Sequence, residues 1–239
     1  MTNQKTIQDK DDTRQLMKNL EEEAEIHLDE VIKFPPVSIS CGTYQDRNTD
    51  GTYTEYPIIL GSDGNFSFSQ AYPKVGKSYF ISLMVSAYQC GQNKYTGKLK
   101  GHRNGRKIIH FDTEQGKFDV SKLAKRPMQM NGITEDKDYH IYYLRSMSFQ
   151  ARIDFIDYIL YDKFSEDRIG LIVIDGIADL CGDVNNMTEA NYAVQKLMEW
   201  SGKLSCHLTT VIHQNFGSDK ATGNLGSALE KKAEQQIKL

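Results

Sequence analysis

The stretch that decides the fold runs from Ala71 to Ser78 and reads AYPKVGKS. It resembles a phosphate-binding loop, whose pattern is a glycine, four free residues, then Gly-Lys and a serine or threonine. Gly76, Lys77 and Ser78 fit this pattern, whereas Ala71 occupies the position of the first glycine. If that position required a positive φ, alanine would cost about 1–2 kcal/mol there. We interpret the stretch as a working nucleotide site and not as a simple turn before a helix.

The neighbouring segments support this interpretation. A strand-like segment, NFSF, precedes the loop, and a helix-like segment, SYFISLMVSAYQ, follows it. Backbone N–H groups of the loop and of the helix N-terminus then converge on one anion, which the helix dipole favours. Lys77 is expected to reach the terminal phosphates of ATP, and the Ser78 hydroxyl to bind Mg²⁺. The residues expected to contact the nucleotide are Lys74, Val75, Gly76, Lys77, Ser78 and Tyr79.

Further along the chain, short apolar segments alternate with helical ones. The expected strands are NFSFSQ (65–70), KIIHFD (107–112), HIYYL (140–144), GLIVID (170–175) and HLTTVIH (207–213). The helical segments are 78–89, 118–126, 149–164 and 190–204. Strands that are continuously apolar belong to a sheet covered by helices on both faces. The sequence therefore predicts an α/β fold with a mostly parallel sheet, and small antiparallel strands between Val37 and Ser62.

Residues 1–36 are expected to form an N-terminal helical arm, with residues 37–239 as the core domain. Within residues 11–34, a helix would place Leu16, Leu20, Ala24 and Val31 on one face, opposite a strongly acidic face. The prolines at 35 and 36 end this helix. It packs either on its own domain or on a neighbouring subunit.

Composition narrows the class of protein. The 239 residues carry a formal net charge of −3, with 26% charged and 39% hydrophobic residues, so there is no overall attraction to nucleic acid or membrane. The four cysteines contain no C-x-x-C pair, which argues against a zinc ribbon and for free thiols. The first residues are polar, and no apolar run approaches the roughly 18 residues of a membrane span. We expect a cytoplasmic protein without a membrane partner.

Two carboxylates follow apolar strands. Asp175 ends GLIVID, where it is placed to hold Mg²⁺ through water; its alternative role is a helix cap. Glu114 follows KIIHFD and can orient the water that attacks the γ-phosphate. Asp112 competes for that role, and either acid could instead cap the next helix. We favour Glu114 because it lies further beyond the strand end.

The order of these motifs resembles the RecA-like P-loop ATPase superfamily. The loop comes first, then strands ending in DTEQ, IDG and IHQN. The similarity spans roughly Gly64 to the C-terminus and is closest to the RepA-like hexameric helicases and related ATPases of bacterial plasmids and mobile elements, in which alanine occurs at the first loop position. The resemblance implies that Glu114 is catalytic and that His213 and Gln214 sense the γ-phosphate. From its position alone, His213 could equally be a core histidine.

The same resemblance implies a ring-forming homo-oligomer, a hexamer, whose sites are completed by a basic finger from the adjacent subunit. Lys231 and Lys232 are the candidates, although a charged, solvated helix face explains them better. Arginine stabilises transferring phosphoryl groups better than lysine, so its absence there counts against coupled hydrolysis. The family's last strands are expected to begin around QQIKL, which suggests that a C-terminal part is missing.

Contacts with DNA have weaker support. The segment 93–107, NKYTGKLKGHRNGRK, carries six basic residues and no acid, and is expected to form an exposed loop that either contacts phosphates or is merely solvated. The basic residues are Lys94, Lys98, Lys100, Arg103, Arg106 and Lys107. In RecA-like rings, loops after the fourth and fifth strands line the channel, and here Phe216 could stack on a base. The acids Asp183, Glu189 and Asp219 weaken the charge of these loops, in which Lys220 is the one lysine.

The function we predict is ATP binding and hydrolysis with Mg²⁺ as cofactor, coupled to a helicase- or translocase-like action on DNA, single-stranded by expectation. Its setting would be the replication or transfer of a mobile element. One alternative is an ATP-dependent DNA-binding scaffold or regulator with little turnover. Another is a KaiC-like phosphotransferase that moves phosphate onto protein hydroxyls.

Overall fold

The computed structural model describes residues 13–22, 24–91, 97–215, 217 and 220–239. The chain divides into two units, Met1–Phe34 and Pro35–Leu239. The strands of the second unit are β1 Val37–Arg47, β2 Tyr53–Ser62, β3 Phe66–Ala71, β4 Leu99–Gly101, β5 Lys107–Asp112, β6 Tyr139–Tyr143, β7 Ile169–Asp175, β8 His207–His213 and β9 Gln235–Lys238. Its helices are α2 Lys77–Cys90, α3 Lys117–Asn131, α4 Phe149–Asp157, a π-helical turn η1 Tyr158–Lys163, a 3₁₀ turn η2 Ile177–Leu180, α5 Met187–Lys203 and α6 Gly223–Lys232.

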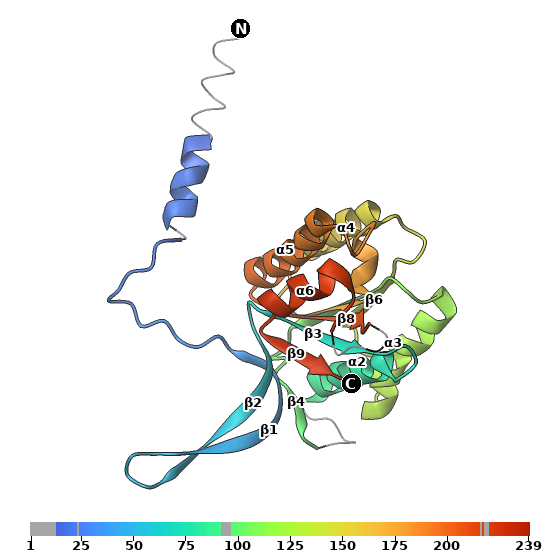
Figure 1. Ribbon diagram of the computed structural model, residues 1–239. Helices are drawn as coiled ribbons and strands as arrows, with labels where there is room; N and C mark the ends of the chain where they lie inside the picture. Colours follow the sequence, from blue (N-terminus) through green and yellow to red (C-terminus); the bar gives the residue numbers. More distant parts are fainter. Residues whose placement is uncertain (1–12, 23, 92–96, 216, 218–219) are drawn as a thin grey trace, which may run out of the picture. The chain divides into compact units, whose positions relative to one another are not determined.

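The second unit is built on a six-stranded parallel sheet in the order β6-β5-β7-β8-β3-β9. Helices α2 and α3 cover one face, and α4, α5 and α6 cover the other (Figure 1). Neighbouring residues of β7 divide between these faces: Leu171 and Val173 pack in the cluster with α2, whereas Ile172 and Ile174 pack against α4, α5 and α6. Burial on both faces explains the continuously apolar strands, and the predicted α/β class is confirmed.

A second, antiparallel sheet has the order β2-β1-β4. The sequence predicted only short strands here, but β1 and β2 form a long ribbon whose distal half is exposed (Figure 1). At its inner end Ile39 is fully buried and packs with Leu99 and residues of α2. The predicted antiparallel strands are thus confirmed, and they are longer than expected.

The first unit differs from expectation. Residues 13–22 and residue 24 are helical, but residues 25–36 are not, so the predicted helix over 11–34 is wrong in its second half. Its last turn is closed by Glu25, whose N–H donates to the Glu21 carbonyl at 3.0 Å. Like charges four residues apart destabilise a helix, and a short helix without a packing surface is marginal. The part of the predicted arm in residues 1–12 lies outside the described residues.

Two helices of the second unit also depart from the sequence pattern. The helix expected over 149–164 changes to π-helical geometry after Asp157, and the N–H of Phe164 donates five residues back to the Ile159 carbonyl. Helix α3 continues past Arg126 and through Pro127 to Asn131. A proline inside a helix normally ends or kinks it, which is why the sequence suggested an earlier end. None of the helices in the described ranges combines the length and apolar composition needed to cross a bilayer.

The contact between β2 and β8 gives a test of this packing. Gly61 lies against the ring of His207, and a Cβ added at Gly61 would come within 2.2 Å of that ring. The ring cannot easily move, since it is fully buried and hydrogen-bonds the Ser67 hydroxyl at 2.9 Å and the Ser62 carbonyl at 3.2 Å. A glycine is therefore required here by close approach.

We expect Gly61→Ala to lower the free energy of unfolding by about 1–3 kcal/mol through overpacking, measured by chemical or thermal unfolding. The matched control is Gly202→Ala in α5, where an added Cβ meets nothing within 4 Å. There alanine should stabilise the helix by up to about 1 kcal/mol. Equal stability of the two variants would contradict this account of the packing.

Candidate functional site

The carboxyl ends of four parallel strands bring the expected site residues to one edge of the sheet. In the strand register, Ala71 at the end of β3 pairs with His213 at the end of β8. Asp112 at the end of β5 pairs with Asp175 at the end of β7. Ligands of open α/β sheets bind outside this edge. The strand ends that carry the predicted site therefore lie at the same edge of the sheet.

The segment after β3 leaves its backbone donors open. Ala71 is a fully buried strand residue, and it is not among the residues with positive φ, so no backbone strain follows from the missing first glycine. The positive φ values in the loop belong to Lys74 at 68° and Gly76 at 96°. Among the described residues, no protein acceptor takes the backbone N–H groups of residues 75–78. A helix N-terminus with open donors favours an anion.

A cavity of about 570 Å³ opens beside this helix N-terminus. Seven of the expected residues or their competitors line it: Lys74, Gly76, Lys77, Ser78, Tyr79, Glu114 and His213. Val75, Asp175 and Gln214 do not belong to this lining, and the Val75 side chain is exposed. The backbone of Gln214 instead joins the ends of β8 and β3, because its N–H donates to the Ala71 carbonyl. The sensing role expected for Gln214 stays a prediction.

Three lining residues were not anticipated: Pro73, Gln115 and Arg126. Gln115 directly follows Glu114, and its side-chain amide donates to the Ser78 hydroxyl at 3.2 Å. Arg126 comes from α3, nearly fifty residues after the loop, and reaches the Ser78 carbonyl at 3.4 Å. Nothing local in the sequence around Arg126 indicates this position, since it depends on how α3 packs on α2. Gln115 could have been found from its place in DTEQ.

Lys77, His213 and Glu114 form a chain of contacts inside the cavity. The Lys77 ammonium donates to Nδ1 of His213 at 2.8 Å, and Nε2 of His213 lies 3.7 Å from a Glu114 carboxylate oxygen. Burial lowers the pKa of Lys77, against the opposing effect of the negative charges of Glu114 and Asp175. The Lys77 ammonium thus already donates one of its three N–H groups to His213.

Asp112 and Glu114, the two acids considered for the catalytic role, occupy different environments. Asp112 is fully buried, and one of its carboxylate oxygens accepts the N–H groups of Glu114 at 3.1 Å and Gln115 at 2.8 Å. Burial raises the pKa of Asp112 to about 6. Asp112 therefore holds the turn, while Glu114, with about a third of its side chain exposed, faces the cavity.

Close packing fixes Glu114 against the end of β7. The Thr113 hydroxyl donates to the carbonyls of Asp175 and Gly176, at 3.1 and 2.8 Å. Gly176 has a φ of 109°, and a Cβ there would lie 2.3 Å from the Thr113 hydroxyl and 2.7 Å from Cγ of Glu114. Only glycine satisfies both the backbone conformation and this contact. The glycine of the IDG motif thus helps to position Glu114.

Asp175 has the chemistry of a cation ligand. Its side chain is 3% exposed, and one carboxylate oxygen is buried without a hydrogen-bond partner. Burial raises the pKa of Asp175 to about 7, helped by the charges of Asp112 and Glu114 and opposed by a hydrogen bond with Ser78 and by Lys77. Mg²⁺ typically uses one or two protein oxygens together with phosphates and waters. One hydroxyl and one unsatisfied carboxylate oxygen fit that requirement, although the described residues contain no cluster of three histidine, cysteine or acidic side chains suited to a metal.

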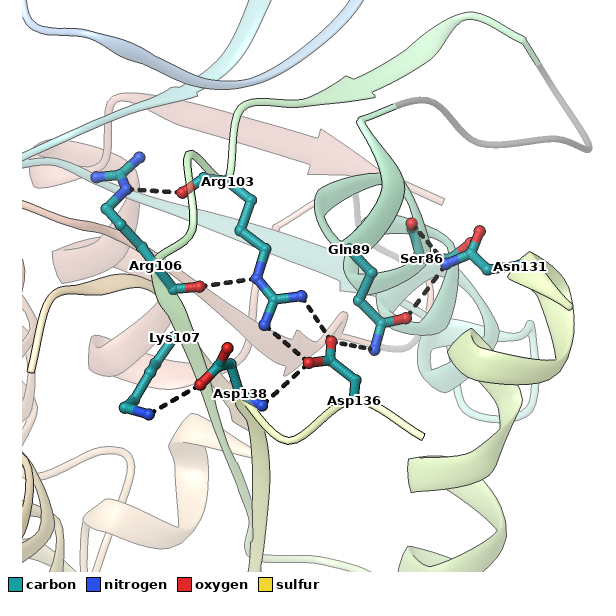
Figure 2. A network of polar contacts seen from close by, with 8 residues as sticks. All are labelled: Ser86, Gln89, Arg103, Arg106, Lys107, Asn131, Asp136 and Asp138. Carbon is teal, nitrogen blue, oxygen red and sulfur yellow. Dashed lines mark hydrogen bonds and ion pairs between the residues drawn. The ribbon is translucent and has the colours of Figure 1, made fainter. Parts of the chain in front are cut away.

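The basic segment predicted as an exposed loop is not a free cationic patch (Figure 2). Arg103 makes two hydrogen bonds to Asp136, at 2.6 and 3.0 Å, and Lys107 pairs with Asp138 at 2.9 Å. Arg106 is only 6% exposed and pairs with Asp63 at 2.7 Å. The acids come from other parts of the chain, so the local sequence could not show them. Lys98 and Lys100 are exposed, and Lys94 lies outside the described residues.

The other residues considered for contacts with DNA or phosphate lie in several different environments. Glu189 has a structural role, because it accepts the N–H groups of Gly182 and Asp183 at 2.7 and 2.9 Å. Lys231 and Lys232 are exposed on α6 and line a separate depression of about 300 Å³ between α5 and α6. Phe216 and Asp219 lie outside the described residues. These positions provide no further support for a nucleic-acid site.

The chain matches no protein-family model, and no curated protein is significantly similar to it. A function must therefore be argued from the geometry of the cavity and its residues. All four cysteines are free thiols, as the sequence suggested.

The raised pKa of Asp175 predicts a pH-dependent stability. A carboxyl whose pKa is about 7 in the folded state, against 3.8 normally, contributes stability that is full below about pH 4 and is lost as the pH rises through 7. Asp112, Glu114 and Lys77 are the charged groups that act on it. Asp175→Asn should therefore raise the melting temperature more at pH 8 than at pH 5, by roughly 3–10 °C.

Calorimetric melting of the wild type and the variant at the two pH values checks this expectation. Asp162→Asn, an exposed acid away from the cavity, is the matched control and should change the melting temperature equally at both pH values. An equal effect of Asp175→Asn at pH 5 and pH 8 would show that its carboxyl is already ionised in the folded protein at pH 5.

Proposed function

We propose that the chain is a cytoplasmic RecA-like P-loop ATPase that binds Mg-ATP in the 570 Å³ cavity and hydrolyses it. One observation carries the proposal. Lys77, Ser78, Glu114 and His213 line one cavity, although they follow three different strands. Open backbone donors at the N-terminus of α2 add an anion-binding feature at the same place. If residues 71–78 were only a turn before a helix, nothing would require a lysine, a hydroxyl, a carboxylate and an imidazole to line the same cavity.

Each residue has a role in this chemistry. The open N–H groups of the loop and the Lys77 ammonium bind the phosphate oxygens. The Glu114 carboxylate accepts a proton from the attacking water, whose oxygen bonds to the γ-phosphorus while the bond to the bridging β–γ oxygen breaks, giving ADP and phosphate. Ser78 and Asp175 are the residues that would hold Mg²⁺. When bound, that ion supplies neutralisation of the phosphate charges.

The contact between Lys77 and His213 suggests how the site responds to ATP. Lys77 donates to His213 at 2.8 Å, and bound phosphates would compete with this ring for the ammonium. His213, once released, is free to hydrogen-bond an oxygen of the γ-phosphate. Such a change of partner is a physical mechanism for the γ-phosphate sensing that the family resemblance implied for His213.

Ring assembly, as a hexamer, and action on single-stranded DNA are proposed from the family resemblance. Among the described residues of the basic segment, Lys98 and Lys100 are exposed. An ATP-dependent DNA-binding scaffold or regulator with little turnover is the second candidate, because the residues proposed as the trans finger are lysines, which stabilise transferring phosphoryl groups less well than arginine. Arg103, Arg106 and Lys107 are paired with acids, which leaves fewer cations for DNA in either case. Lys231 and Lys232 lie away from the cavity of their own chain, as either a trans finger or a solvated helix face would.

The decisive measurement is ATP affinity together with ATP turnover, with and without single-stranded DNA. Glu114→Gln should bind ATP within a few-fold of the wild type but lose turnover by roughly 10²–10⁴-fold, because it removes the proton acceptor and keeps the shape of the side chain. Glu166→Gln, on an exposed segment outside the cavity, is the control and should leave both quantities unchanged.

Failure of the wild type to bind Mg-ATP would reject the nucleotide site. Binding without turnover in either protein would favour the scaffold, and phosphate appearing on a serine or threonine of the protein would favour a phosphotransferase. Stimulation of the wild type by single-stranded DNA would support the motor, whereas equal turnover with and without DNA would argue against a DNA-coupled reaction.

A further inference from the structure

An aromatic ring and a guanidinium lie together in the wall of the cavity, beyond the residues assigned to the phosphates. Tyr79 directly follows Ser78 in the first turn of α2, and half of its side chain is exposed. The guanidinium of Arg126 on α3 lies over the Tyr79 ring, 5.4 Å from its centroid. Both residues line the cavity. Neither is used by the proposed hydrolysis.

Arg126 is weakly held apart from this stacking. Its hydrogen bonds to the Ser78 carbonyl and the Ser82 hydroxyl are long, at 3.4 and 3.5 Å. Within the described parts of the chain, it has no ion pair with a carboxylate. The guanidinium therefore supports the Tyr79 ring from one side and keeps donors available.

The spacing of the two side chains is fixed by the packing of their helices. Asn131 of α3 makes two buried hydrogen bonds to Ser86 of α2, each of 2.9 Å, and a third to Gln89 at 3.2 Å (Figure 2). These bonds tie the carboxyl-terminal half of α3 to α2, one helix turn beyond Arg126. A binding surface that is rigid before the ligand arrives loses less freedom on binding.

We propose that Tyr79 and Arg126 form the subsite for the base of the nucleotide. This inference rests on the proposed function, because the phosphate end is placed at Lys77 and Ser78. Tyr79 follows Ser78 in the sequence and also lines the cavity. Its half-exposed ring offers a flat surface to an aromatic base. A cavity of about 570 Å³ lies within the usual range of roughly 300–1,000 Å³ for small-molecule sites.

The chemistry of the subsite determines its selectivity. Stacking on an aromatic ring uses the face of a base, which every base presents, and not the hydrogen-bonding edge that distinguishes one base from another. The Tyr79–Arg126 pair should therefore distinguish a nucleotide from a bare polyphosphate more strongly than it distinguishes ATP from GTP.

Binding of ATP and of inorganic tripolyphosphate, each with Mg²⁺ and measured by calorimetry, tests the subsite. Tyr79→Ala should weaken ATP binding by roughly tenfold to a hundredfold, while tripolyphosphate binding stays within about twofold. Tyr79→Phe keeps the ring and should restore ATP binding. Arg126→Met should weaken ATP binding by roughly threefold to tenfold. Tyr192→Ala, an exposed tyrosine on α5 outside this cavity, should change neither ligand.

The two ligands separate this inference from the function on which it rests. If the wild type binds both and Tyr79→Ala weakens neither, or weakens both equally, the base subsite is overturned while the phosphate site stands. If the wild type binds neither ligand, the nucleotide site and the subsite both fail. A loss confined to ATP, with a far-ultraviolet circular dichroism spectrum like that of the wild type, supports the subsite.

Discussion

The candidate site depends on one constraint, which is the register of the parallel strands. Asp112 is level with Asp175, and Ala71 is level with His213. Because Asp175 pairs with Val211, the second pair of strand ends lies two residues further along the sheet than the first. A shift by one residue would turn every side chain of a strand to the opposite face. The apolar residues of β7, which pack on both faces, resist such a shift less than an alternating strand would. The turn bonds of Thr113 to the end of β7 therefore matter for the register as well as for Glu114.

This arrangement brings like charges together in a buried place. Asp112 and Asp175 are almost fully buried, and each has one carboxylate oxygen without a hydrogen-bond partner. Such groups oppose folding unless they are protonated or meet a cation. Burial is the largest cause of both raised pKa values. The charges of Glu114 and Asp179 add to it at Asp112, and those of Asp112 and Glu114 add to it at Asp175. Strongly perturbed carboxyls beside a cavity are typical of functional sites, because a purely structural core would replace them with apolar groups.

The sequence predicted the parts of the fold that depend on local patterns. Strands β5 and β8 agree with the segments KIIHFD and HLTTVIH residue for residue, since their apolar runs are bounded by polar ones. The loop and the acids after the strands were found because their spacing is local as well. Arg126 was missed because its place in the cavity comes from helix packing. The ion pairs of Arg103 and Arg106 were missed because their acids, Asp136 and Asp63, are distant in the sequence.

The Lys77–His213 contact also links the cavity to the C-terminal part of the chain. The His213 carbonyl accepts two hydrogen bonds from Thr222, from its N–H at 3.1 Å and from its hydroxyl at 2.7 Å. Thr222 is the residue before α6, the helix that carries Lys231 and Lys232. If Lys77 exchanges His213 for a phosphate, the side chain of His213 has two defined arrangements, while its backbone stays bonded to the start of α6. A two-state contact of this kind is what coupling between sites requires.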